Sequence, residues 1–283
     1  MPPRPKLTDR AALRRHRARA LAAGTGADFL HRRAVSEIKE RLALVNRTFT
    51  KAALVTGMPQ LWQKAFPRAR IIADTEVLDL REAEHDLVIH ALALHWANDP
   101  VGQIVQSRLA LEPDGMFLGI TFGGATLTEL RQALAEAETA VTGGLSPRVA
   151  PMADIRELGS LLQRAGLAMP VADSLRIDVR YRSLRRLLHD LRAIGETNAL
   201  AARERRPMPR ALLRETERRY RSRFADGEGL IATFELIVLT GWAPAPGQPV
   251  PLRPGSASAR LADALGTREY PLGEPARPRR SPG

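Results

Sequence analysis

The sequence predicts an α/β fold with a mostly parallel sheet and helices on both of its faces. Two continuous apolar runs, at 86–96 and 116–124, lack polar alternation, as expected of strands that are buried on both faces. A helical pattern at 98–115, stopped by a Pro-Asp-Gly turn, separates them, and another at 126–141 follows them. Strands and helices that alternate at this spacing form βαβ units, whose strands run parallel.

The flanking segments extend the same alternation. Helices are predicted at 7–24, 27–45, 59–66, 153–167, 183–200 and 209–224, and strands at 52–57, 70–73, 175–181 and 230–242. Pro, Gly and Ser dominate the end of the chain, which favours irregular structure there. We therefore expect an N-terminal helical segment (1–50), a main domain (51–242) with a helical insertion (about 183–228), and a partly disordered tail (243–283).

The composition limits the classes of protein that fit. The 283 residues carry a formal net charge of +12 and include no cysteine, which excludes disulfides and thiolate metal sites. The N-terminus is basic, but no apolar stretch of signal-peptide or membrane-spanning length follows it. We expect a cytoplasmic protein with no specific nucleic-acid partner, because aromatic residues make up only 5% and basic residues gather at the ends and on helical faces. Weak association with anionic surfaces is compatible with this charge.

Five short motifs carry a family resemblance. They are LHW-x-ND (94–99), FGG-x-TL-x-ELR (122–131), GG-x-SPR-x-AP (143–151), LLQRAG (161–166) and GETNAL (195–200). Together they resemble class I S-adenosylmethionine-dependent methyltransferases, and within these the subfamily of the mitochondrial complex I assembly factor that hydroxylates an arginine, with its alphaproteobacterial relatives. The enzymes that methylate a malonyl carrier in biotin synthesis share the LHW feature but less of the rest. The resemblance covers nearly the whole chain and implies a Rossmann-like methyltransferase fold.

The resemblance implies S-adenosylmethionine as cofactor, held by Gly57, Asp74 and Ala91 at the carboxyl ends of the first strands. The loop after the first predicted strand reads GMPQLW, so only Gly57 remains of the family's glycine-rich pattern. The stretch 71–89 matches the family's adenine-side segment, so Asp74 corresponds to the adenine-side acid. The second strand with its ribose acid is absent, which shortens the fold by one strand–helix unit. Alternatively, Gly57 and Asp74 are ordinary turn residues.

These losses predict weak cofactor binding. Each charge-assisted hydrogen bond is worth about 1.5–3 kcal/mol, so the missing contacts would move a micromolar ligand toward the millimolar range.

The candidate catalytic residues are His95, Glu196 and Asn198. His95 follows the central buried strand, at the rim where α/β folds bind ligands, and it can act as an acid or base. Glu196 and Asn198 belong to the GETNAL motif, and a carboxylate beside an amide suits a guanidinium group. The alternatives are a structural role for His95 and a helix C-cap for the other two.

Neighbouring polar residues have simpler interpretations. Trp96 is expected to pack against a helix that Asn98 or Asp99 caps, Thr126 and Glu129 are expected to form a capping box, and Gly123 and Gly124 can serve both a turn and an anion site. His90 is expected in the core, and His31, His85 and His189 at the surface. No histidine pair has metal-ligand spacing, so no metal site is predicted.

Two main hypotheses follow. The resemblance implies a methyltransferase-superfamily protein that modifies an arginine of a protein substrate, with a respiratory complex I subunit as candidate partner. The alternative is a catalytically degenerate scaffold or assembly protein, a pseudoenzyme that no longer binds the cofactor. A third hypothesis is a small-molecule methyltransferase of the biotin-synthesis type.

Overall fold

The computed structural model describes residues 6–24, 28–227, 229–248 and 266. The chain divides into a main unit, Met1–Pro246, and a second unit, Gly247–Gly283. Most of the tail that was expected to be partly disordered lies outside the described residues. Among the described residues, no helix is both long enough and apolar enough to span a membrane.

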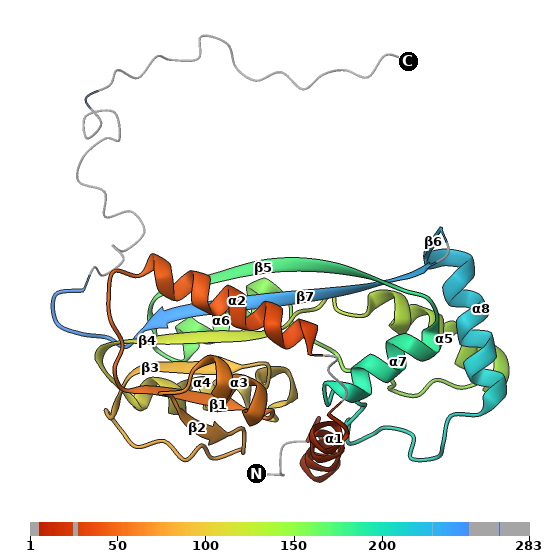
Figure 1. Ribbon diagram of the computed structural model, residues 1–283, viewed down its shortest axis with the longest axis horizontal. Coiled ribbons are helices and arrows are strands. Elements are labelled where there is room, and N and C mark those ends of the chain that lie inside the picture. The colour runs from red at the N-terminus through yellow and green to blue at the C-terminus, as the bar shows by residue number, and fades with distance from the viewer. Residues whose placement is uncertain (1–5, 25–27, 228, 249–265, 267–283) are drawn as a thin grey trace. The chain divides into compact units, whose positions relative to one another are not determined.

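One sheet of seven strands forms the centre of the main unit (Figure 1). The strands are β1 (Ala52–Thr56), β2 (Arg70–Ala73), β3 (His85–Ala91), β4 (Leu111–Phe122), β5 (Ala168–Tyr181), β6 (Ala225–Asp226) and β7 (Gly229–Trp242). Their order is β2-β1-β3-β4-β7-β5, and β6 pairs with β7 outside this path. The strands β2, β1, β3 and β4 run parallel, whereas every pairing of β7 is antiparallel.

The register of the parallel strands places their central apolar residues side by side. Leu54 pairs with Ile89, and Ile89 pairs with Leu118, so three apolar segments far apart in sequence lie side by side. Because the strands are parallel, the carboxyl ends of β1, β2 and β3 meet at the same edge of the sheet. This confirms the predicted arrangement of the central segments.

Helices cover both faces of the sheet. They are α1 (Arg10–Ala23), α2 (Phe29–Leu44), α3 (Pro59–Ala65), α4 (Pro100–Leu109), α5 (Thr128–Thr142), α6 (Ile155–Arg164), α7 (Leu184–Ala193) and α8 (Arg210–Phe224), and a 3-10 turn, η1 (Leu94–Trp96), precedes α4. Leu54, Ile89 and Leu118 share one core with α2, α5, α7 and α8. The alternate residues Val55 and Val88 face the opposite way and pack with α4 and α6. The α/β fold predicted from the alternation is therefore confirmed.

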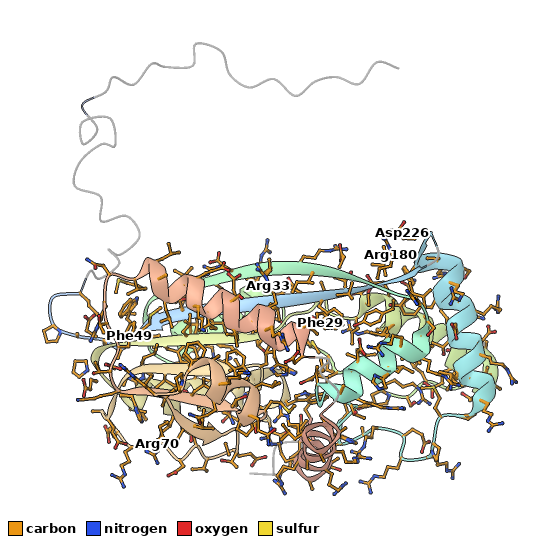
Figure 2. The ribbon with its side chains drawn as sticks, in the orientation of Figure 1. Phe29, Arg33, Phe49, Arg70, Arg180 and Asp226 are labelled. Carbon is orange, nitrogen blue, oxygen red and sulfur yellow. The ribbon has the colours of Figure 1, made fainter. Side chains whose placement is uncertain are left out.

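The sequence of α2 shows why the helix lies flat on the sheet. Phe29 and Arg33 are one turn apart, and both are labelled in Figure 2. The ring of Phe29 packs edge-on to Phe234 of β7, with 6.3 Å between centroids. The Arg33 side chain stays 43% exposed and pairs with Glu37 one turn later. The amphipathic pattern therefore predicts both the helix and its buried face.

Two boundaries differ from those that the sequence predicts. The apolar run 86–96 is not one strand: β3 ends at Ala91, and Leu92 turns the chain with a φ of 44° before η1. The helix α4 ends at Leu109, and the Pro-Asp-Gly sequence lies inside β4, where Asp114 has a φ of 62°. Apolar composition alone does not show where a strand stops and a buried turn begins.

The edge of the sheet shows where the fold is shortened. In a doubly wound sheet the second strand pairs with the first, and a further strand lies outside it. Here β2 pairs directly with β1 and is the edge strand, so the predicted loss of one strand–helix unit is confirmed. Asp74 follows the end of β2, the strand beside β1, which is where the fold places the ribose acid, so its assignment as the adenine-side acid stays a prediction. The remaining strand takes this position because β1 must pair its backbone groups on both sides.

The predicted capping box at the start of α5 is wrong. The helix begins at Thr128, one residue after Leu127, whose φ is 56°. The Thr126 hydroxyl accepts from Glu235 N at 3.0 Å, and Glu129 accepts from Thr233 N at 3.1 Å. Both side chains therefore tie the turn to β7, a long-range partner that a local sequence motif does not reveal.

Candidate functional site

Helix α1 lies at the carboxyl ends of the parallel strands. It begins at Asp9, whose carboxylate accepts from Ala12 N at 2.9 Å, and ends at Gly24, which has a left-handed conformation. The segment before it pairs Thr8 with Leu200, and Thr8 N donates to Asn98 Oδ1 at 2.9 Å. These contacts hold an arginine-rich helix against the edge of the sheet where ligands bind in α/β folds.

Arg17 of α1 lies in the crevice between β1 and β2. Its Nη1 atom donates to Asp74 Oδ2 at 2.5 Å, and both side chains are almost fully buried. A β-carbon built on Gly57 would clash with the guanidinium group of Arg17. Because Gly57 has no side chain, a ligand could approach its backbone closely. In this structure Arg17 occupies that space instead.

A second glycine makes room for the same side chain. Gly195, the first residue of the GETNAL motif, has a φ of 80°, and a β-carbon there would lie 2.9 Å from Arg17 Cγ and 3.4 Å from Met58 Sδ. Arg17 thus passes between Gly57 and Gly195 to reach Asp74. The two glycines come from two separate candidate motifs, and the structure brings them together around one arginine.

Asp74 has a second arginine partner from the same helix. Arg10 Nη2 lies 3.2 Å from Asp74 Oδ2, donates to the Asp74 carbonyl, and its Nη1 donates to Trp96 O at 3.3 Å. Burial lowers the pKa of Arg10, and the charge of Asp74 opposes this shift. The carboxylate of Asp74 is therefore engaged by two cations at the end of β2.

The crevice residues do not fit S-adenosylmethionine as they are arranged. A nucleoside cofactor needs open backbone after the first strand and a carboxylate free to accept from the ribose. Arg17 covers Gly57 and engages Asp74, and Ala91, the third predicted cofactor residue, is fully buried within the core at the end of β3. No chemical step of this protein can therefore be derived through the cofactor from this arrangement.

His95 and Glu196 meet beside this crevice. His95 Nε2 lies 3.0 Å from Glu196 Oε2, and His95 Nδ1 lies 3.3 Å from Thr121 Oγ1. Trp96 Nε1 donates to the same Glu196 oxygen at 2.7 Å. Two of the three predicted catalytic residues, 101 positions apart, therefore form one buried cluster.

Neighbouring groups keep the Glu196 carboxyl ionised. Burial alone would raise the pKa of this carboxyl, but the charge and hydrogen bond of His95, with Arg17 and Trp96, outweigh burial and lower it. Glu196 is therefore an anion at neutral pH in an enclosed place. Such a carboxylate can orient an imidazole or accept a guanidinium.

Asn198 lies apart from that cluster. Its Nδ2 donates to Pro147 O at 2.9 Å, and its Oδ1 accepts from Leu200 N at 3.0 Å, so it joins two loops. The structure therefore does not bring Asn198 together with His95, and a catalytic role for it stays an untested prediction.

The expected roles of the neighbouring residues are partly corrected. Asp99 caps α4 through Gly102 N at 2.9 Å, as predicted, but Asn98 instead binds the chain before α1. Trp96 packs in a small core with Leu13 and donates to Glu196 instead of packing on α4.

The histidines separate into buried and exposed groups. His90 is fully buried and pairs with Gln103 at 2.7 Å, and burial lowers its pKa to about 4. His31 and His85 are also buried, which corrects their expected surface position. Trp62 Nε1 donates to His31 Nδ1 at 3.1 Å, and burial lowers the His31 pKa to about 4. Among the described residues no group of three His, Asp or Glu side chains could hold a metal ion.

A cavity of about 1050 Å³ opens next to Glu196. Trp96, Phe122 and Phe234 line it, together with residues of α5, α7 and α8. Gly57 and Asp74 do not line this cavity. This cavity therefore lies beside α5, α7 and α8 and not over the crevice that Arg17 fills.

Sequence reasoning missed Arg10 and Arg17. Both belong to the basic N-terminal segment, where six arginines precede Ala20 and the pattern resembles a solvated face. Helical spacing could have indicated that Arg17 is buried, because Leu13, Arg17 and Ala20 recur at that spacing and share the buried side of α1. An arginine on a buried face requires an acidic partner, which the sequence alone did not identify.

Relatives with curated names place the chain in a family. Arginine-hydroxylase NDUFAF5, mitochondrial, of Danio rerio is 32% identical over 231 residues, which are 81% of this chain and 72% of that protein. The Mus musculus protein of the same name is 37% identical over 198 residues, and the chain spans only 57% of its length. Malonyl-(acyl-carrier protein) O-methyltransferase of Laribacter hongkongensis is 34% identical over 247 residues, 85% of this chain and 81% of that protein.

No protein-family model matches the sequence. The sheet is mostly parallel with helices on both faces, as the resemblance implies, and the relatives support the same family. The chain therefore belongs to the class I S-adenosylmethionine-dependent methyltransferase superfamily, in the family of the arginine-hydroxylase NDUFAF5.

Proposed function

We propose that this protein acts in the cytoplasm as an assembly protein for a respiratory complex I subunit, and that it does so without using S-adenosylmethionine. The observation that carries this proposal is the position of Arg17, between Gly57 and Gly195 and in contact with Asp74. The resemblance of the sequence motifs to the subfamily of the complex I assembly factor supports complex I as the target, and the relatives named arginine-hydroxylase NDUFAF5 support membership of that family.

The energetics of the crevice support a role without the cofactor. For a nucleoside to reach Asp74, Arg17 must leave a buried ion pair, and breaking such a pair costs about 3–5 kcal/mol. That cost corresponds to a loss of affinity of about a hundredfold or more. Because Arg10 also engages Asp74, removing Arg17 alone does not free the carboxylate completely.

Isothermal titration of the purified protein with S-adenosylmethionine and S-adenosylhomocysteine tests the proposal directly. We expect no saturable binding below the millimolar range for the wild type, and tighter binding by Arg17→Ala. Arg14→Ala, an exposed position on the same helix, is the matched control and should behave as the wild type. Micromolar affinity of the wild type would overturn the proposal.

The proposed assembly role is tested separately, by measuring the amount of assembled complex I. In a host that makes complex I, deleting the gene should lower the amount of assembled complex on native gels. Mass spectrometry should find no arginine modification that depends on the gene. Normal assembly without the gene would contradict the proposed role.

Arginine modification of a protein is the second candidate function. One observation favours it: Glu196 lines the large cavity as a carboxylate whose pKa is lowered, and guanidinium groups pair with carboxylates. The test is mass spectrometry of complex I subunits from hosts that carry wild type or Glu196→Gln. A modified arginine that disappears with Glu196→Gln would favour this function over the first.

A further inference from the structure

The cavity beside Glu196 has an apolar floor. Its apolar wall combines the end of β4 and a residue inside β7 with faces of α5 and α7, namely Phe122, Phe234, Leu130, Leu134 and Leu191. Each of these side chains is buried, and none carries a polar atom. At about 1050 Å³ the cavity is at the upper end of the size range of small-molecule sites. A ligand that fills it must present a large apolar part.

The rim of the same cavity is strongly basic. Six arginines are among its lining residues, against three carboxylates. The six arginines are Arg15, Arg148, Arg185, Arg192, Arg203 and Arg205. They come from α1, from α7 and from the two loops after α5 and Leu200, so four separate segments bring positive charge to one opening.

Most of this positive charge has no internal partner. Arg148 pairs with Glu138 at 2.6 Å, and Arg203 pairs with Asp9 at 3.0 Å. Arg15, Arg185, Arg192 and Arg205 are exposed, and none forms an ion pair with a carboxylate of the described residues. Four free guanidinium groups around an apolar cavity are ready to accept an anionic group from outside.

We propose that this cavity binds a single-chain amphiphile: an aliphatic chain on the apolar floor with an anionic head group at the arginine rim. The apolar side chains provide the transfer free energy for the chain, and the guanidinium groups select the charge of the head. This inference does not depend on whether the crevice at Gly57 binds a cofactor.

The chemistry of the walls favours an acyl chain over a polypeptide. A peptide that entered the floor would bring backbone N–H and C=O groups, which cost free energy when they are buried without partners. Leu130, Leu134 and Phe234 offer no such partners. A ligand with a cationic side chain would also have to pass four unpaired arginines, so the rim opposes it, and the arginine substrate of the second candidate function would meet the same barrier.

Equilibrium dialysis with dodecanoate, below the concentration at which it forms micelles, tests the inference on the full-length protein. Dodecanol and dodecyltrimethylammonium carry the same chain with a neutral and a cationic head, and dodecyl phosphate carries a second anionic head. We expect one saturable site for dodecanoate and for dodecyl phosphate, weaker binding of dodecanol, and no saturable binding of the cation. Raising the salt concentration should weaken binding of the anions.

Two double variants separate the effect of the rim arginines on dodecanoate affinity from the effect of the protein's net charge. Arg185→Gln/Arg192→Gln removes two free rim charges on α7 and should weaken dodecanoate binding about tenfold. Arg156→Gln/Arg164→Gln removes two exposed charges on α6 and should leave the affinity unchanged. Both pairs are exposed, so both variants should fold.

Four results would overturn the inference: no saturable site for dodecanoate, equal affinity for the cationic amphiphile, equal losses in the two double variants, or unchanged affinity in Arg185→Gln/Arg192→Gln. Binding of a glutamate-rich peptide without binding of dodecanoate would also overturn it, and would assign the rim to a protein partner.

Discussion

Arg17 and Asp74 are 57 positions apart in the sequence, and their side chains meet at 2.5 Å between Nη1 and Oδ2. The arginine side chain is 5% exposed and the aspartate 11%, so solvent screens the pair weakly. The contact joins the N-terminal helix to the end of β2, at the edge of the sheet where the fold family binds its cofactor. This interaction therefore helps to hold α1 in place and closes the crevice.

Arg17→Ala should destabilise the protein. Removing the guanidinium leaves Asp74 buried with Arg10 as its only described ion-pair partner, and breaking a buried pair costs roughly 3 kcal/mol. Urea denaturation at neutral pH measures the change in unfolding free energy. Arg14→Ala, which is exposed on the same helix, should change it by less than about 0.5 kcal/mol. Equal effects of the two substitutions would show that the pair contributes no stability.

Gly195→Ala should lower the unfolding free energy by more than the strain of a left-handed backbone conformation alone would. Gly195 has a φ of 80° and faces Arg17 Cγ, whereas Gly24 has a φ of 56° and open space at the β-carbon position. We expect Gly24→Ala to lower the unfolding free energy by about 1 kcal/mol, and Gly195→Ala by about 2 kcal/mol or more.

The excess at Gly195 should come from Arg17. In the Arg17→Ala background the cost of Gly195→Ala should fall to that of Gly24→Ala, because the contacted side chain is gone. Denaturation of the wild type, Arg17→Ala, Gly195→Ala and the variant with both substitutions gives this comparison as a double-mutant cycle. An excess that persists without Arg17 would show that another neighbour causes it.

Much of the fold could be predicted from the sequence because its signals are local. The apolar runs near residues 54, 88 and 118 report burial on both faces, and the helical patterns between them require parallel crossovers. The bounds of β2, Arg70–Ala73, were predicted residue for residue, because Ile71 and Ile72 are flanked by charge and a turn. The position of β2 beside β1 was not predicted, since pairing is decided by the whole sheet.

The site was predicted only in part for the same reason. His95 and Glu196 were identified from motifs, and the structure brings them together. The partners of Asp74 are arginines of a helix that the composition describes as basic surface, and the helical spacing that places Arg17 on the buried side does not show which acid it meets. Periodicity does not reveal long-range ion pairs, so the contact between Arg17 and Asp74 that closes the crevice could not be identified before the structure.

Stability should decrease as the pH falls from about 6.5 toward about 4. Burial lowers the pKa values of His31 and His90 from 6.5 to about 4, so in this window the unfolded chain binds more protons than the folded protein. The stabilisation is complete above pH 6.5 and is lost as the pH falls through the window, by up to about 1.4 kcal/mol per pH unit for each histidine.

Urea denaturation across this pH range tests the prediction. His31→Gln/His90→Gln, although less stable at neutral pH, should show a flatter dependence on pH, because neither replaced group titrates. An unchanged slope in the double variant would show that other groups take up the protons.

Glu196→Gln should lower the unfolding free energy at neutral pH by about 2 kcal/mol. The amide can still accept from Trp96 Nε1, but it loses the charge that pairs with His95 and Arg17. Because the Glu196 pKa is lowered from its usual 4.5, the stabilisation is present above about pH 4.5 and is lost as the pH falls through the folded-state pKa. The difference between wild type and variant should therefore narrow in acid.

Glu204→Gln provides the matched control, since Glu204 lines the same cavity but is exposed. Its substitution should leave the unfolding free energy close to that of the wild type. A gap between wild type and Glu196→Gln that stays constant in acid would mean that the carboxylate charge does not stabilise the cluster. In that case Glu196 would act there only as a hydrogen-bond acceptor for Trp96, and the amide would replace it without loss of that bond.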